Sequence, residues 1–294
     1  MTGTGGEDDS WLRAVSGDGG RGPLLARGGQ LVHGARRLGE LVRRRPPGIT
    51  GNQWSTALRE GYDLVVCAAG TDRPVFAVEI GPVAPAGSAG QRVERLKSAV
   101  AEAVGLAVLR IGSPTLRADG HGRRVVAYVI DARGYAQLDA DEAEDADEPP
   151  VGFRDILGRL PDGRTGHVND LGALARAAAV EAYVSRRLAD PIVRGLHVRW
   201  AGGPAEGWSW VRVRPDACLV ERVTVHEERF SAGVDPGRLA EDLAALALGE
   251  RLRALEATGP ELTPHDELLA DIRRLESRRD EMTGGFAYAH LCAD

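Results

Sequence analysis

The chain has 294 residues, 43% of them hydrophobic, which is enough for one large or two ordinary domains with their own cores. No apolar run approaches the roughly 18 residues of a membrane-spanning helix, and the Gly-rich acidic start is unlike a secretory signal or transit peptide. Three cysteines far apart in the sequence argue against a zinc finger and a disulfide framework, so we expect a cytoplasmic bacterial protein without membrane association.

The formal net charge is −6, but the acidic residues are unevenly distributed. Seven acids and no base lie between Asp139 and Glu148, and Pro149 and Pro150 follow them. Outside this run, 37 basic residues are balanced by 36 acidic ones. The overall acidity therefore neither excludes nor indicates a polyanionic ligand.

The N-terminal half predicts a tail and a compact α/β core. Residues 1–24 are rich in Gly, Asp and Ser without an apolar period, and we expect a disordered tail. Residues 25–44 carry apolar side chains at three- and four-residue steps, which predicts a helix. The following elements of this core, which spans residues 25–135, are predicted as strands 62–67 and 74–80, a helix 91–104, and strands 107–111 and 125–130.

The C-terminal half predicts an acidic linker, residues 136–150, and an α+β extension, residues 151–294. The predicted elements of the extension are a helix 169–188, strands 196–200, 208–214 and 219–226, and two helices that start after Asp235 and Thr263. Turns between the three strands predict an antiparallel meander, and Asp235 and Thr263 are expected to cap the final helices. Trp208 and Trp210 share one face of a strand; we favour a core- or partner-packing role over base stacking.

Lys97 is the only lysine among the 37 basic residues. A lysine in an arginine-rich composition supplies a compact charge or a proton, which arginine does not, and chance is the alternative explanation. Helical geometry places Lys97 about 20° from Val104 and about 40° from Val93, on the inward stripe of the helix 91–104. We therefore expect Lys97 to face the strands.

Two carboxylates are predicted to meet in the hairpin 62–80. If the hairpin is symmetric about Thr71, Leu64 faces Val78 and Asp63 faces Glu79. Directly opposed side chains have Cβ atoms roughly 5 Å apart, so the two carboxylates repel each other unless a divalent cation such as Mg²⁺ binds between them. A register shift of one residue would place the two acids on opposite faces.

These segments resemble the PD-(D/E)XK, or restriction-endonuclease-like, nuclease superfamily. The resemblance rests on the runs YDLVV, VFAVEI, QRVERLK and GLAVLRI, within about 50 residues. It implies a mixed sheet core flanked by helices, with Asp63 and Glu79 as ligands of a catalytic Mg²⁺ or Mn²⁺. Lys97 would position or activate the attacking water. The family usually has its lysine two residues after the second acid, where this chain has Gly81, and some branches place it on the following helix.

Five arginines gather on and just after the first predicted helix: Arg36, Arg37, Arg43, Arg44 and Arg45. We identify them as candidate nucleic-acid-binding residues, because arginines contact phosphates without reading sequence. A solvated arginine-rich face is the alternative.

The sequence thus predicts a metal-dependent nuclease that hydrolyses nucleic-acid phosphodiester bonds, with DNA rather than RNA as its expected partner. The alternative is a catalytically silent nuclease-like fold that serves as a nucleic-acid- or protein-binding regulatory subunit. In that case Asp63 caps a strand end, Glu79 lies at an exposed rim, and Lys97 extends past the apolar stripe. A third alternative is a scaffold that binds a protein partner through residues 151–294.

Overall fold

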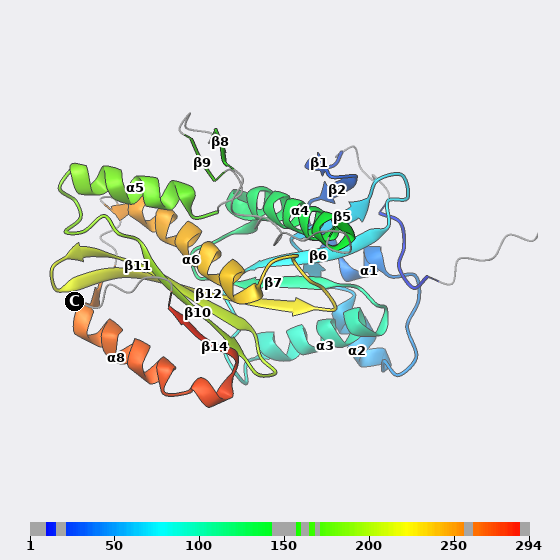
Figure 1. The fold of residues 1–294 in the computed structure, drawn as a ribbon. Helices are drawn as coiled ribbons and strands as arrows, with labels where there is room; N and C mark the ends of the chain where they lie inside the picture. The colour runs from blue at the N-terminus through cyan, green and yellow to red at the C-terminus, as the bar shows by residue number, and fades with distance from the viewer. Residues whose placement is uncertain are drawn as a thin grey trace, which may run out of the picture. The chain divides into compact units, whose positions relative to one another are not determined.

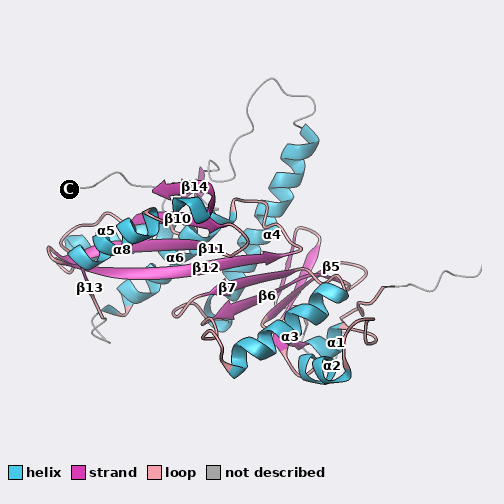
Figure 2. Cartoon of the chain, turned by 90° about the horizontal axis from the view of Figure 1, so that it is seen from below, coloured by secondary structure: helices cyan, strands magenta, loops and turns pink. Residues whose placement is uncertain are grey.

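The chain is a mixed α/β protein with a large mixed β-sheet flanked by helices (Figures 1 and 2). The computed structural model describes residues 10–15, 22–142, 157–159, 165–167, 171–255 and 261–288. The chain divides into two compact units, the first with residues 1–79, 84–109 and 228–230 and the second with residues 80–83, 110–227 and 231–294. Within the described ranges, no helix is both long and apolar enough to cross a membrane.

The first unit contains β1, β2, β5, most of β6 and the first two residues of β7, which follow one another in the sheet in the order β1-β2-β5-β6-β7. Their bounds are β1 (Leu25–Arg27), β2 (Gln30–His33), β5 (Leu64–Ala68), β6 (Pro74–Gly81) and β7 (Val108–Gly112). Strand β1 pairs antiparallel with β2, β2 with β5, and β5 with β6. Strand β7 runs parallel to β6, because the N–H of Ala77 donates to the Ala107 carbonyl and, further along both strands, the N–H of Ser113 donates to the Gly81 carbonyl. Two short strands, β3 (Arg36–Arg37) and β4 (Gly61–Tyr62), form a separate pair.

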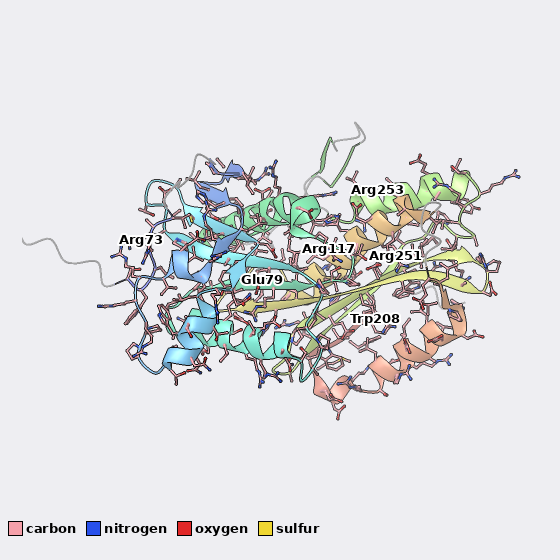
Figure 3. The ribbon with its side chains drawn as sticks, turned by 180° about the vertical axis from the view of Figure 1, so that it is seen from behind. Arg73, Glu79, Arg117, Trp208, Arg251 and Arg253 are labelled. Atoms are coloured by element: carbon pink, nitrogen blue, oxygen red, sulfur yellow. The ribbon has the colours of Figure 1, made fainter. Side chains whose placement is uncertain are left out.

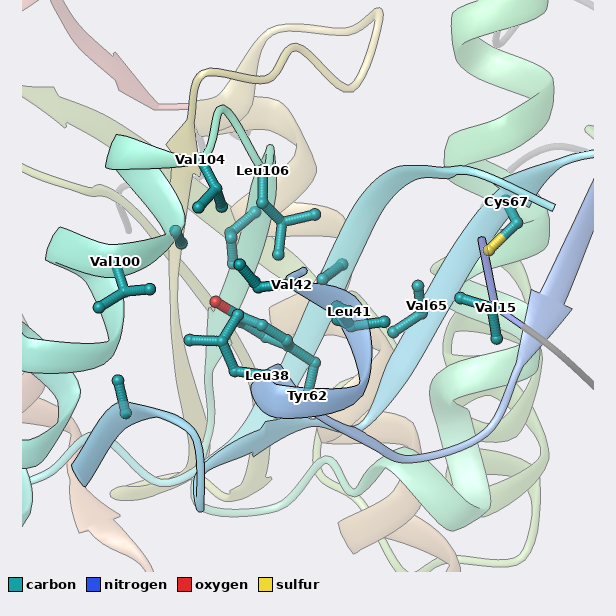
Figure 4. Packing of buried hydrophobic residues seen from close by; sticks show 14 residues of the cluster. Val15, Leu38, Leu41, Val42, Tyr62, Val65, Cys67, Val100, Val104 and Leu106 are labelled. Carbon is teal, nitrogen blue, oxygen red and sulfur yellow. The ribbon is translucent and has the colours of Figure 1, made fainter. Parts of the chain in front are cut away.

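Three helices cover one face of this part of the sheet (Figure 2). They are α1 (Leu38–Leu41), α2 (Gly51–Ala57) and α3 (Ala89–Ala103). Leu38 and Leu41 of α1 and Val100 of α3 share a buried cluster with Val65 of β5 and Ala77 of β6 (Figure 4). The predicted helix 91–104 and the predicted strands 62–67, 74–80 and 107–111 are confirmed.

The predicted helix over residues 25–44 is wrong. Gly28 and Gly29 have φ values of +53° and +69°, which form the turn of a β1–β2 hairpin and interrupt any helix. Strand β2 then pairs with β5, so a partner distant in sequence decides the conformation. The predicted tail is also wrong for residues 10–15, because Leu12 bridges to Val42 and Val15 is buried. Residues 1–9 and 16–21 of that tail lie outside the described residues.

The second unit contains the predicted antiparallel meander, which is confirmed. Its strands run in the order β12-β11-β10-β14, with β13 paired to β12, and β8 and β9 form a separate hairpin. The strand bounds are β8 (Leu157–Arg159), β9 (Thr165–His167), β10 (Arg194–Trp200), β11 (Ala205–Arg214), β12 (Ala217–Glu228), β13 (Thr263–Pro264) and β14 (Met282–Tyr288). The helices are α4 (Ala118–Glu142), α5 (Ala173–Val184), α6 (Pro236–Arg253), α8 (His265–Glu276) and the 3₁₀ helix η2 (Arg279–Glu281).

Helices cover both faces of the meander. Helices α5 and α6 lie on one face and α8 on the other (Figure 1). Val211 and Leu219 pack toward α6, whereas Trp208 and Trp210 pack toward Leu268 of α8. Both tryptophans are buried, so they are core residues, as favoured, rather than a base-stacking surface.

The remaining differences from the predicted elements have local causes. The predicted strand 125–130 is wrong, because this run lies inside α4; six consecutive apolar residues fit a buried helix as well as a buried strand. Helix α4 also includes residues 136–142 of the predicted acidic linker, and residues 143–150 lie outside the described residues. Asp235 caps α6 as predicted, through the N–H of Arg238. Thr263 does not cap α8, because it pairs with Cys218 as part of β13.

Replacing Gly207 by Ala should destabilise the second unit. A Cβ at Gly207 would overlap the backbone of Ala240 and Glu241, so α6 would have to move away from β11. We expect a loss of at least about 2 kcal/mol in the free energy of unfolding, measured by urea denaturation. Gly134→Ala is the control, since a Cβ there meets nothing within 4 Å and α4 should gain roughly 0.5–1 kcal/mol. Equal stability of Gly207→Ala and wild type would contradict the close packing of α6 on β11.

Candidate functional site

The β5–β6 hairpin has the predicted register up to the candidate acids. Leu64 pairs with Val78 and Val65 with Ala77, as symmetry about Thr71 requires. The register shifts between Val66 and Cys67, near the turn. Val65 and Ala77 belong to the buried cluster under α3. Glu79 is two residues after Ala77 on the same strand, so its side chain lies on the same face of the sheet.

Lys97 lies on the buried face of α3, as the periodicity predicts. Its side chain is 7% exposed, and Val100 and Ala101 on the same helix are fully buried. A lysine ammonium in such a position needs compensating partners, because an unpaired buried charge is strongly destabilising.

The Lys97 ammonium has three partners in the first unit. It forms a hydrogen-bonded ion pair with Oε1 of Glu79, which projects from β6 (Figure 3). It donates a second hydrogen bond to the Gly61 carbonyl at 3.1 Å, and it lies 4.9 Å from the centroid of the Tyr62 ring, within the range of a cation–π interaction. The sequence predicts that Lys97 and Glu79 share one layer, and the structure brings them into contact.

Gly61 and Tyr62 are site residues that the sequence does not reveal. A Cβ at Gly61 would lie 2.6 Å from the Arg36 carbonyl, so only glycine allows β4 to pair with β3 and present its own carbonyl to Lys97. The Tyr62 ring is buried in the hydrophobic cluster (Figure 4). Both contacts depend on pairing between segments distant in sequence, for which a single sequence carries no signal.

Asp63 lies next to the regular ladder. Its N–H donates to the Val78 carbonyl at 3.0 Å, while Leu64 is the residue that pairs with Val78. Asp63 and Leu64 thus both lie opposite Val78, which is the arrangement of a β-bulge. A bulge redirects the side chain that it carries, so Asp63 is half-buried near the Glu79 segment but is not a regular partner of Glu79.

The site offers few side chains that could act as ligands of a metal ion. Among the residues that the structure describes, no three His, Cys, Asp or Glu side chains form a group suited to hold a metal. Carboxylate oxygens are nevertheless the ligands that Mg²⁺ prefers, and Mg²⁺ commonly binds through one or two carboxylates and several waters. The bulge at Asp63 leaves Glu79 as the carboxylate that the structure places against Lys97, so a cation bound by Glu79 would have to share it with this ammonium.

The five candidate nucleic-acid-binding arginines belong to a strand and a loop rather than to one helix. Arg36 and Arg37 form β3, and Arg43, Arg44 and Arg45 follow the single turn of α1. All five are exposed except Arg36, which is half-buried. The Arg44 guanidinium lies 4.6 Å from the centroid of the Trp11 ring. These arginines are therefore presented at the surface of the first unit, which contains Lys97 and Glu79.

His33 and Cys67 are buried residues with titratable side chains, and the sequence patterns do not single them out. Neither ring nitrogen of His33 has a hydrogen-bond partner within the described ranges, and burial together with the charge of Arg36 lowers the pKa of His33. Burial raises the pKa of the Cys67 thiol to about 12, helped by the charge of Asp72. Cys67 is therefore protonated at neutral pH and is not an activated nucleophile.

The second unit holds a buried carboxyl group of its own. Oε1 of Glu221 on β12 accepts hydrogen bonds from Thr115 and from Arg251 of α6, each at 3.0 Å. Burial raises the pKa of Glu221, although these two hydrogen bonds oppose the shift. Arg251 forms an ion pair with the Glu221 carboxylate, and we interpret this ion pair as a link between β12 and α6.

Comparisons with protein-family models, curated proteins and solved structures find no match to this chain.

Acidification should destabilise the first unit through His33. Because the pKa of His33 is lower in the folded protein than in the unfolded chain, the unfolded chain binds more protons as the pH falls below about 6.5. The stability conferred by neutral His33 is thus complete above this pH and is lost as the pH falls toward the folded-state pKa. We expect His33→Leu to reduce the loss of unfolding free energy between pH 7.5 and pH 5.5 by up to about 1.4 kcal/mol, measured by urea denaturation. Identical losses in both proteins would contradict this role of His33.

Proposed function

We propose that the chain is a cytoplasmic metal-dependent nuclease that hydrolyses phosphodiester bonds of nucleic acid, with DNA preferred over RNA. The observation that carries this proposal is the contact between the only lysine of the chain and Glu79 on the neighbouring strand. Metal-dependent phosphodiester cleavage uses carboxylates to hold a cation and benefits from a further positive charge near the scissile phosphate. Glu79 and Lys97 supply these two groups within one contact.

The topology of the first unit supports a restriction-endonuclease-like core. Three antiparallel strands, β2, β5 and β6, are followed by helix α3 and then by β7, which runs parallel to β6. The candidate acids come from β6 and from the residue before β5, and the lysine comes from the helix between β6 and β7. This order is similar to that implied by the sequence resemblance, with the lysine moved to the helix.

Each residue of the site has a definite task in the proposed reaction. Asp63 and Glu79 would hold Mg²⁺ or Mn²⁺, which when bound polarises the phosphate and lowers the pKa of a coordinated water. Lys97 would hold the attacking water or stabilise the charge that develops on the phosphoryl oxygens. The exposed arginines Arg37 and Arg43 and their neighbours would bind the phosphate backbone and position it.

A second candidate function is a catalytically silent nuclease-like subunit that binds nucleic acid or protein. One observation favours it: the Lys97 ammonium already has three protein partners, which is sufficient for a structural role. Gly81 at the position where the family usually has lysine agrees with this alternative.

A nuclease assay with Mg²⁺ or Mn²⁺ on single- and double-stranded DNA and RNA separates the two functions. If the proposal is correct, the wild type cleaves, EDTA abolishes cleavage, and Asp63→Ala, Glu79→Gln and Lys97→Ala each lower the rate by about 10²-fold or more. Glu102→Gln is the matched control, because Glu102 is an exposed acid on α3, and it should retain the wild-type rate. Cleavage that all three site variants retain would end the catalytic assignment, and binding without cleavage by the wild type would establish the silent alternative.

A further inference from the structure

We propose that Lys97 is the resident counter-ion of Glu79 and competes with a divalent cation for the Glu79 carboxylate. This inference rests on the proposed metal-dependent function and concerns the regulation of the same site. It predicts that the lysine needed for activity also weakens the binding of the metal.

The position of the ion pair sets the ammonium against a second cation on the same carboxylate. The ammonium contacts Oε1 of Glu79, and the Glu79 side chain is 23% exposed whereas that of Lys97 is only 7% exposed, so the acid is the partner nearer to solvent. A carboxylate in such surroundings is strongly stabilised by an adjacent positive charge. A divalent cation on the same carboxylate would lie a few ångströms from the ammonium, where the repulsion between like charges is large and little screened.

The other two partners of Lys97 keep the ammonium in the site when Glu79 changes partner. The Gly61 carbonyl and the Tyr62 ring both belong to β4, and neither is a metal ligand in the proposed site. The ammonium can therefore give up Oε1 of Glu79 and remain bonded to β4. A cation and a lysine would then both be available beside the phosphate, at the cost of one broken ion pair.

Two consequences follow for the protein in solution. The metal should bind more tightly when residue 97 is neutral, because no ion pair has to break. Metal binding should also make the Lys97 amine more reactive, because the ammonium loses its strongest partner. The second consequence can be measured cleanly, since the chain contains one lysine.

The first test is Mn²⁺ binding to the full chain by isothermal titration calorimetry or electron paramagnetic resonance. We expect Lys97→Met to lower the dissociation constant for Mn²⁺ by about tenfold or more relative to wild type. Arg95→Met is the matched control, since it removes one positive charge from an exposed position of the same helix and should change the constant by less than about twofold. Equal constants for wild type and Lys97→Met, or an equal gain for Arg95→Met, would overturn the competition.

The second test uses the wild type and remains decisive if Lys97→Met fails to fold. Acetylation of Lys97 by acetic anhydride is followed by mass spectrometry of the peptide that contains it. Saturating Mn²⁺ should raise the acetylation rate of Lys97 in the wild type by about fivefold or more. In the Glu79→Gln variant, Lys97 should be acetylated rapidly with or without the metal. An unchanged or lower rate with Mn²⁺ would refute the proposal.

The outcomes also separate this inference from the nuclease function. Mn²⁺ binding that is independent of residue 97, together with metal-dependent cleavage, would refute the competition alone. Competition without cleavage would refute the nuclease and leave the counter-ion role of Lys97. If Mn²⁺ binds to none of the variants, both proposals fail.

Discussion

The ion pair between Lys97 and Glu79 connects the main parts of the first unit's site. It joins helix α3 to strand β6, and through the second hydrogen bond of Lys97 it adds strand β4. Strand β4 can take this place only because Gly61 lets its backbone approach the Arg36 carbonyl. A helix, a sheet strand and a short strand pair are thus fixed by one ammonium group, and the candidate chemistry depends on the same atoms.

The parts of the fold that the sequence predicts are those determined by local pattern. The stripe of α3 places Lys97 correctly because a helix of 15 residues repeats its period several times. The register of β5 and β6 is correct from Leu64 to Val66 and shifts only between Val66 and Cys67, near the turn. Asp235 caps α6 because a short polar side chain before a proline is a strong helix start.

The parts that could not be predicted depend on distant partners. The run over residues 25–44 has a helical period, but β2 in it pairs with β5 more than thirty positions along the chain. The buried run of α4 is apolar on all sides and therefore has no period to distinguish helix from strand. In the site, Lys97 and Glu79 follow from helix and hairpin geometry. The bulge at Asp63 and the position of the Gly61 carbonyl arise from pairing with other strands, which the local sequence pattern does not reveal.

Stability alone is a weak reason for the ion pair to exist. A partly buried pair of charges pays a desolvation cost, and replacing such a pair by apolar side chains of similar volume is often neutral or stabilising. The neighbours of Lys97 on α3 are Val100 and Ala101, and a methionine or leucine at position 97 would continue that surface. The acid is the more exposed partner of the pair, since the Glu79 side chain is 23% exposed and that of Lys97 7%. The proposed exchange of partners gives this pair a reason to exist that stability alone does not: Lys97 stays anchored to β4 through Gly61 and Tyr62 while Glu79 is the more exposed partner.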